Sequence, residues 1–252
     1  MDRLSHVDRQ TKKSSLKRKK TLVAYSFILP SLTGFLIFTF VPIIFSLILA
    51  FCEWDSGNPI KFIGFKNFSY MFLKDKSFWI SLKNTIYYTV VTVPLTMVVA
   101  LFLAILMNKP LKGRVFFRSV LFFPYVASLV AIAVVWLALF NPEIGPINSI
   151  LRTLGVENPP RWAASTTWAM PTIIGLTVWK SMGYYMIVYL AALQAISKDL
   201  YEAAALDGAN GWQQFLNVTW PGITPTTFYI LMMLMVTTFK SYDIMYITTQ
   251  GG

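Results

Sequence analysis

Residues 21–52 read TLVAYSFILPSLTGFLIFTFVPIIFSLILAFC, and none of their side chains carries a charge. A helix needs about 20 mostly apolar residues to cross the hydrocarbon layer of a membrane. The run exceeds that length, and it is also longer than the apolar core of a cleaved secretion signal, which has about 7–15 residues. The stretch therefore predicts a membrane-spanning helix at Leu22–Phe51.

Further apolar runs of membrane-spanning length follow along the chain. They are Asn84–Met107, Ser119–Phe140, Thr167–Leu193 and Thr226–Thr248. A helix satisfies its own backbone hydrogen bonds within lipid, and continuous apolar length without period-two alternation favours helices over strands. The sequence therefore predicts an all-α, polytopic membrane helical bundle with five transmembrane helices.

The composition agrees with a membrane protein that has a basic cytoplasmic arm at residues 1–21. Hydrophobic residues make up 56% of the chain and charged residues 13%, and the mean hydropathy is +0.57, which is too apolar for a soluble domain. The net charge is +11, yet no aromatic or glycine-rich RNA motif accompanies the basic arm. Such an arm sets membrane orientation or contacts anionic lipid. We therefore expect a cytoplasmic N-terminus and no binding of nucleic acid.

Metal and disulfide chemistry are not expected in this sequence. Cys52 is its single cysteine and His6 its single histidine. An internal disulfide needs two cysteines, and zinc sites made of thiolates or imidazoles need several ligands. We therefore predict no metal site and no bound cofactor.

A polar interruption, ISKDLYEAAALDGANGWQQFLNVTWP at Ile196–Pro221, separates the last two apolar runs. Asp199 is expected to cap a short helix, with Glu202 returning a hydrogen bond as in a capping box. Asp207 and Gly208 form a turn signal, because glycine adopts a positive φ without strain. The first half of the interruption therefore predicts a short helix followed by a turn.

The second half of the interruption has the spacing of an amphipathic helix. Trp212, Phe215, Leu216 and Thr219 fall on one helical face, and Pro221 is expected to end the helix. The whole segment is thus predicted to form a cytoplasmic helix-turn-helix, with small alanines that allow close approach of a partner and an apolar stripe that lies against the membrane helices.

The hairpin resembles the cytoplasmic loop of permease subunits of binding-protein-dependent ABC importers, which have the type I importer fold. That loop has the pattern Glu-Ala-Ala, three residues, Gly, nine residues, Ile-x-Leu-Pro. Glu202-Ala203-Ala204, Gly208 and Pro221 match it at the family's spacing. Val218 replaces the usual Ile and Trp220 the usual Leu, so the apolar end of the motif differs while its polar part matches.

Other stretches are similar to the carbohydrate-transporting branch of this family, which includes maltose-type and glycerol-3-phosphate-type permeases. The matching stretches are Gly64–Phe68, Arg114–Arg118 with Phe123-Pro124, Gly145–Asn148, Ala191–Gln194 and Tyr242–Gly252. In that family the sequence continues past the final Gly-Gly into one further helix. The resemblance therefore implies a permease domain at residues 22–252, with its core at 80–252, a missing C-terminal helix and six transmembrane helices in the complete protein.

The resemblance also implies a mechanical role rather than an enzymatic one. The coupling loop, with Glu202, Ala203, Ala204, Asp207, Gly208 and Pro221, would dock on a separate ATPase subunit. The expected assembly holds two such ATPases, a second permease subunit and an extracytoplasmic solute-binding protein, in a bacterial or archaeal cell membrane. The sequence lacks a Gly-x-x-x-x-Gly-Lys-Ser/Thr loop, so ATP and magnesium would be bound by the partner subunits.

Charged residues within the membrane runs leave two interpretations open. Lys180 lies in the middle of the fourth run, where a lysine costs about 2.5–3.5 kcal/mol and needs a partner or a cavity. Lys240 and Asp243 are three residues apart and could form an ion pair on one helix face. Alternatively, Lys180, Tyr184, Tyr242 and Asp243 surround a polar path for a sugar or related substrate.

Two other classes of function compete with a sugar importer. An ion-coupled secondary transporter could use the membrane lysines and Asp243 to couple protons or ions, but it has no need of the hairpin motif. An intramembrane enzyme lacks support, because the sequence has no His-Glu-x-x-His motif and no evident Ser/His arrangement. The connecting segment at residues 141–164 is the expected contact for an external binding protein.

Overall fold

The computed structural model describes residues 2–55 and 57–249, with side chains from Lys19 onward. The chain divides into two compact units, Met1–Trp79 and Ile80–Gly252. The side chains of the basic arm before Lys19 and the last residues of the Tyr242–Gly252 motif, 250–252, lie outside the described part.

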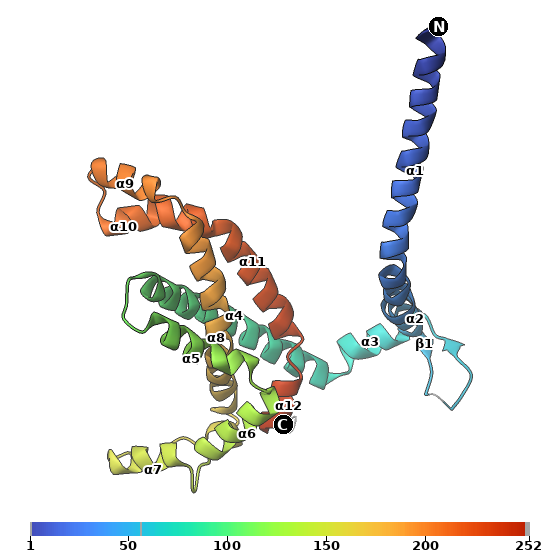
Figure 1. Cartoon of the computed structure of the whole chain (residues 1–252). Coiled ribbons are helices and arrows are strands. Elements are labelled where there is room, and N and C mark those ends of the chain that lie inside the picture. Colours follow the sequence, from blue (N-terminus) through green and yellow to red (C-terminus); the bar gives the residue numbers. More distant parts are fainter. Residues whose placement is uncertain (1, 56, 250–252) are drawn as a thin grey trace. The chain divides into compact units, whose positions relative to one another are not determined.

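The first unit consists of one long helix followed by two short strands and a short helix (Figure 1). Its elements are α1 (Asp2–Phe35), a π-helical turn (Leu36–Phe40), α2 (Val41–Leu49), the antiparallel strands β1 (Cys52–Glu53) and β2 (Lys61–Phe62), and α3 (Lys66–Leu73). The Asn67 side chain donates from Nδ2 to the carbonyl oxygens of Ala50 and Cys52, at 3.0 and 2.9 Å. The Gly64–Phe68 motif therefore holds the start of α3 against the end of the membrane helix.

In the second unit, all regular secondary structure that the structure describes is helical, and its first helix, α4, begins in the last residues of the first unit (Figure 1). Its elements are α4 (Lys76–Asn108), α5 (Arg114–Val126), α6 (Leu129–Leu139), α7 (Pro146–Thr153), a 3-10 turn (Trp162–Ala164), α8 (Ala169–Ala195), α9 (Lys198–Leu206), α10 (Gly211–Gln214), a π-helical turn (Phe215–Thr219), α11 (Trp220–Phe239) and α12 (Asp243–Thr249). α8 contributes to both apolar cores: Tyr189 packs in the cluster that includes Ile230 of α11, and Leu176 packs in the cluster that includes Ile132 of α6.

Within the described residues, four helices are long and apolar enough to cross a membrane. They are Lys19–Leu49, Lys76–Asn108, Ala169–Ala195 and Gly211–Phe239, and the bent pair α5 and α6 makes a fifth if it is one span. The predicted helical membrane fold is confirmed, as are the first, second and fourth spans. The third and fifth runs differ from the prediction of one continuous helix each.

The third run is broken at Ala127 and Ser128, where α5 and α6 meet at an angle of 100°. Both residues at the break have extended backbone torsions, with ψ of 148° and 130°. Helical hydrogen bonding stops there although the apolar character continues, so hydropathy gave no sign of the break. The fifth run, Thr226–Thr248, is likewise broken at Lys240–Tyr242, between α11 and α12.

The prediction that Pro221 ends the second hairpin helix is wrong, because the helix continues from Gly211 to Phe239. The N–H of Trp220 donates to the oxygen of Phe215, five residues earlier, and Pro221 follows directly. Such a widened turn accommodates a proline, which lacks an N–H and otherwise clashes with the carbonyl four residues before it. Val41 donates to Leu36 in the same way immediately before Pro42.

Candidate functional site

The predicted hairpin is present between α8 and α11, but its caps lie at other residues than expected. Ser197 is the N-cap of α9, and its Oγ accepts a hydrogen bond from the Asp199 N–H at 3.3 Å. The predicted capping box of Asp199 and Glu202 is therefore wrong, because the helix already begins at Lys198. A capping box occurs instead at α10, where Asn210 and Gln213 exchange backbone-to-side-chain hydrogen bonds of 3.0 and 2.8 Å.

Gly208 forms the turn of the hairpin with a φ of +78°, as the sequence predicted. The N–H of Ala209 donates to the oxygen of Ala204 at 2.9 Å, and the N–H of Gly208 donates to that of Ala205 at 3.1 Å. These two bonds are the pair that closes a Schellman motif at a helix C-terminus. Any other residue at position 208 would strain the backbone, although a Cβ there would meet no atom within 4 Å.

The two arms of the hairpin are tied together and leave an exposed tip. The Tyr201 hydroxyl of α9 lies 2.9 Å from Oγ1 of Thr219, so the two arms share a hydrogen bond. Glu202 and Asp207 are exposed, and the apolar Leu206, which lies between them in the sequence, is 90% exposed. A fixed tip with an exposed leucine and two carboxylates is suited to docking against another protein.

Lys180 has its partner at the break between α5 and α6. Its Nζ donates hydrogen bonds to the carbonyl oxygens of Pro124, Tyr125 and Ala127, at 3.1, 3.0 and 3.2 Å. The last carbonyls of a helix have no partners within that helix, and a cation there also interacts favourably with the helix dipole. Lys180 therefore caps α5 from the neighbouring helix α8.

The other residues of the candidate substrate path lie in two places. Tyr184 is one turn after Lys180 on α8 and stacks on Tyr125, with ring centroids 4.4 Å apart and planes at 13°. Tyr242 and Asp243 are exposed at the start of α12, where Tyr242 stacks on Tyr246. Within the described residues no hydrogen bond or ion pair joins Lys180 or Tyr184 to Tyr242 or Asp243.

The predicted ion pair of Lys240 and Asp243 on one helix face is not formed. α11 ends at Phe239 and α12 begins at Asp243, so the two residues belong to different elements. Both side chains are exposed. The spacing rule failed because it assumed a continuous helix through the break.

A stripe of buried polar side chains on α4 was not predicted from the sequence. The Tyr88 hydroxyl is 2.8 Å from Oγ1 of Thr177 on α8 and 3.5 Å from Oγ of Ser241, in the α11–α12 connection. The neighbouring hydroxyls of Thr89, Thr92 and Thr96 are buried without a hydrogen-bond partner. Thr89 and Thr92 are three residues apart and Thr92 and Thr96 four, a spacing that places all three on one helix face. This spacing could have predicted the stripe from the sequence.

The segment after α6 is held by one buried amide. Nδ2 of Asn148 donates to the oxygens of Pro142 and Pro160, both at 3.0 Å, and Oδ1 accepts from Nε1 of Trp162 at 2.6 Å. Trp162 has a φ of +45°, which a bulky side chain rarely adopts. The Gly145–Asn148 motif thus fixes a strained backbone at the 3-10 turn.

Comparison with known proteins places these features in a family. Residues 84–252 match the family described as "Binding-protein-dependent transport system inner membrane component". The chain is 38% identical to the probable ABC transporter permease protein YesP of Bacillus subtilis, over 95% of this chain and 77% of that protein. It is 35% identical to the lactose transport system permease protein LacF of Rhizobium radiobacter, over 96% of this chain and 80% of that one.

Solved structures agree with the sequence comparisons. The fold is similar to a chain of a bacterial ABC transporter involved in the import of the acidic polysaccharide alginate, with a TM-score of 0.76 and 26% identity over 94% of this chain and 83% of that one. A second match, with a TM-score of 0.77 and 26% identity over 92% of this chain and 80% of that one, is to the alginate transporter in complex with an alginate pentasaccharide-bound periplasmic protein.

Proposed function

Because this chain belongs to the family of binding-protein-dependent transport system inner membrane components, we propose that it is the permease subunit of an ATP-driven importer for a sugar. The observation that carries the proposal is the hairpin α9–α10, whose exposed tip is fixed by Gly208. The names of relatives support the substrate class, because they include transport systems for lactose and for trehalose and maltose.

The hairpin is suited to transmit force between subunits. ATP bound with magnesium by two separate ATPase subunits would move the hairpin, and with it α8 and α11, which connect to it directly. The Schellman turn supports this role because it fixes the tip, and the Tyr201–Thr219 hydrogen bond does so because it joins α9 to the helix that continues into α11. Glu202, Ala203, Ala204, Asp207 and Gly208 would contact the ATPase, and Pro221 would join the hairpin to α11.

The remaining partners follow from the same proposal. A second permease subunit completes the path, an extracytoplasmic binding protein delivers the solute, and the basic N-terminal arm lies in the cytoplasm. Tyr184 remains a candidate contact for the substrate, together with Lys180, Tyr242 and Asp243. An ion-coupled transporter has less support, since the Lys180 ammonium is already bound by three carbonyls and Lys240 and Asp243 do not pair.

The substitution Gly208→Asp tests the coupling role. We expect the protein to insert normally, while ATP-dependent uptake falls at least about tenfold, equivalent to about 1.4 kcal/mol, and less ATPase co-purifies. An L-residue with positive φ costs about 1–2 kcal/mol, and the carboxylate would project from the docking tip.

Gly64→Asp is the matched control, because Gly64 also has a positive φ, +60°, and a Cβ added there would meet no atom within 4 Å. It carries a similar backbone penalty far along the sequence from the hairpin. Unchanged uptake and unchanged ATPase co-purification in Gly208→Asp would show that the hairpin is not the coupling element. An equal loss in Gly64→Asp would attribute the effect to general instability.

A further inference from the structure

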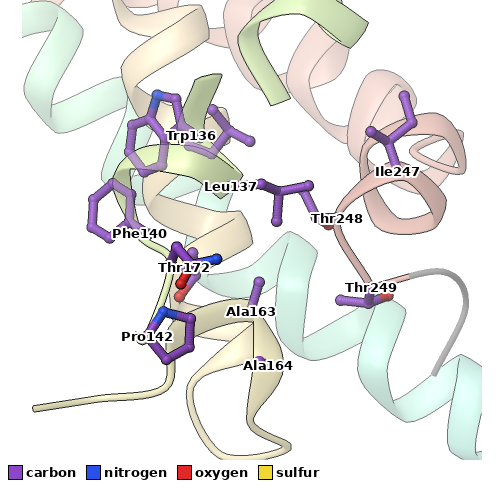
Figure 2. A pocket seen from close by; sticks show the side chains of 12 residues that line it. Trp136, Leu137, Phe140, Pro142, Ala163, Ala164, Thr172, Ile247, Thr248 and Thr249 are labelled. Atoms are coloured by element: carbon purple, nitrogen blue, oxygen red, sulfur yellow. The ribbon is translucent and has the colours of Figure 1, made fainter. Parts of the chain in front are cut away.

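A cavity of about 340 Å³ lies beside the 3-10 turn at Trp162–Ala164 (Figure 2). Its lining comes from four separate parts of the second unit, namely α6, the segment after it, the start of α8, and α12. The lining residues that matter for recognition are Trp136, Phe140, Asn141, Thr172, Thr248 and Thr249. The volume is within the range of small-molecule sites, about 300–1,000 Å³.

The cavity is at the opposite end of the bundle from the hairpin. Thr172 lies near the beginning of α8, whereas the hairpin follows its last residue, and a helix of 27 residues is about 40 Å long. α12 likewise follows the end of α11 that is remote from the hairpin. If the hairpin faces the ATPases, the cavity faces the side from which the solute arrives.

One side of the cavity is an aromatic wall (Figure 2). Its lining residues Trp136 and Phe140 are stacked with centroids 4.8 Å apart, and Trp162, which is not a lining residue, packs edge-on against Phe140 at 4.9 Å. Trp162 is the residue with the strained backbone, and the Asn148 hydrogen bond holds it there. The contact with Trp162 therefore positions Phe140, which does line the cavity.

The cavity also offers hydrogen-bonding groups whose roles are fixed. Asn141 uses Oδ1 to accept from the N–H groups of Glu143 and Ile144, which leaves its Nδ2 as a donor for a ligand. The hydroxyls of Thr172, Thr248 and Thr249 donate to carbonyls of their own helices. Their oxygens therefore keep lone pairs that can accept from ligand hydroxyls.

We propose that this cavity binds a ring of a neutral sugar before the sugar enters the membrane path. Aromatic surface combined with an amide donor and hydroxyl acceptors matches the apolar faces and hydroxyl edges of a pyranose. None of the described residues that line the cavity carries a charge, so a phosphorylated polyol or an acidic sugar would lose its water without gaining a counter-ion. This inference rests on the proposed function and narrows its substrate class.

The test uses the full chain, assembled with its ATPases, second permease and binding protein in proteoliposomes. The probes are radiolabelled lactose and maltose as neutral sugars and glycerol 3-phosphate as an anion, each supplied on saturating binding protein. Thr172→Val removes one hydroxyl at nearly constant shape, and Ala163→Phe fills the cavity. The matched controls are Thr224→Val, whose hydroxyl donates to a carbonyl four residues back at 2.7 Å as that of Thr172 does, and Ala138→Phe, on α6 outside the lining.

We expect the initial rate of neutral-sugar uptake to fall about three- to tenfold in Thr172→Val, the effect of one lost hydrogen bond, and further in Ala163→Phe. In Thr172→Val, ATPase activity stimulated by the loaded binding protein should stay within about twofold, because Thr172 lies on α8, outside the 141–164 segment expected to contact the binding protein, and a merely structural defect would lower both uptake and ATPase activity. Uptake by the controls should stay within about twofold as well.

Each other outcome has a definite meaning. If the loaded binding protein neither stimulates ATPase activity nor supports ATP-dependent uptake in the wild type, the proposed function fails and this inference fails with it. If the wild type imports a neutral sugar but Thr172→Val and Ala163→Phe behave like their controls, only the inference is overturned. If the wild type imports glycerol 3-phosphate in preference to both neutral sugars, the assignment to neutral substrates is wrong.

Discussion

The two breaks in the membrane helices of the second unit are stabilised in different ways. At the α5–α6 break, Lys180 donates to three carbonyl oxygens, all within 3.2 Å. At the α11–α12 break, Ser241 lies 3.5 Å from the Tyr88 hydroxyl, which makes a shorter contact of 2.8 Å with Thr177. The side-chain hydrogen bonds at the first break thus come from an ammonium, and those at the second from a long contact between neutral groups, although Ile244 of α12 also packs in the apolar cluster that includes Ile132.

This difference indicates which break can move. Hydrogen bonds from a charged donor are roughly twice as strong as neutral ones. The α5–α6 break should therefore behave as a fixed part of the fold, while the α11–α12 connection can change at lower free-energy cost. If partner ATPases move the hairpin, as proposed, α11 connects that movement to the α11–α12 break at its far end.

The contact between α5 and α8 offers the strongest way to disturb the fixed break. A Cβ on Gly183 of α8 would overlap the carbonyl oxygen of Leu121 on α5. We expect Gly183→Ala to lower the free energy of unfolding by about 3 kcal/mol, because backbone atoms cannot move aside cheaply. Denaturant titration of the detergent-solubilised protein would measure the change.

Gly175→Ala on the same helix is the control for this substitution. No atom lies within 4 Å of a Cβ there, so alanine should be neutral or stabilise the helix by up to about 1 kcal/mol. If both glycines tolerate alanine equally, the close approach of α8 to α5 is not part of the stable fold.

Removal of the ammonium at the fixed break should have the next largest effect. Lys180→Met keeps the length of the side chain but leaves three carbonyls without a donor, and interhelical hydrogen bonds in membranes contribute about 0.6 kcal/mol each on average. We expect a loss of about 2 kcal/mol in the same unfolding titration. Lys240→Met, at an exposed lysine, should change the free energy of unfolding by less than about 0.5 kcal/mol.

The proposed difference between the two breaks is wrong if Lys180→Met lowers the free energy of unfolding no more than Lys240→Met does. In that case the break would be set by packing alone, and the lysine would be available for another role such as substrate contact. Circular dichroism would show whether the variant gains helix, as expected if α5 and α6 joined into one span.

Local signals explain most of what the sequence predicted correctly. The hairpin is stabilised by residues within a few positions of one another, so its turn at Gly208 could be predicted, although Ser197 was a better N-cap than Asp199. The breaks depend on residues far apart in sequence, since Lys180 and Pro124 are 56 positions apart. The sequence indicates that Lys180 needs a partner, but the carbonyls that bind it belong to the third apolar run, which hydropathy predicts as one continuous helix.

Removal of the Tyr88 hydroxyl should have the smallest effect on the free energy of unfolding, and it tests the α11–α12 break directly. Tyr88→Phe removes its contacts with both Thr177 and Ser241, and we expect the free energy of unfolding to fall by about 1 kcal/mol. Tyr87→Phe, at the exposed neighbouring position, should have no measurable effect.

Ser241→Ala isolates the longer contact, between Ser241 and Tyr88. A double-mutant cycle with Tyr88→Phe should give a coupling energy below about 0.5 kcal/mol, the lower limit for pairs in one hydrogen-bonded network. A coupling as large as the loss in Lys180→Met would mean that both breaks are equally fixed, and the α11–α12 break would then not be the place where the proposed hairpin movement is accommodated.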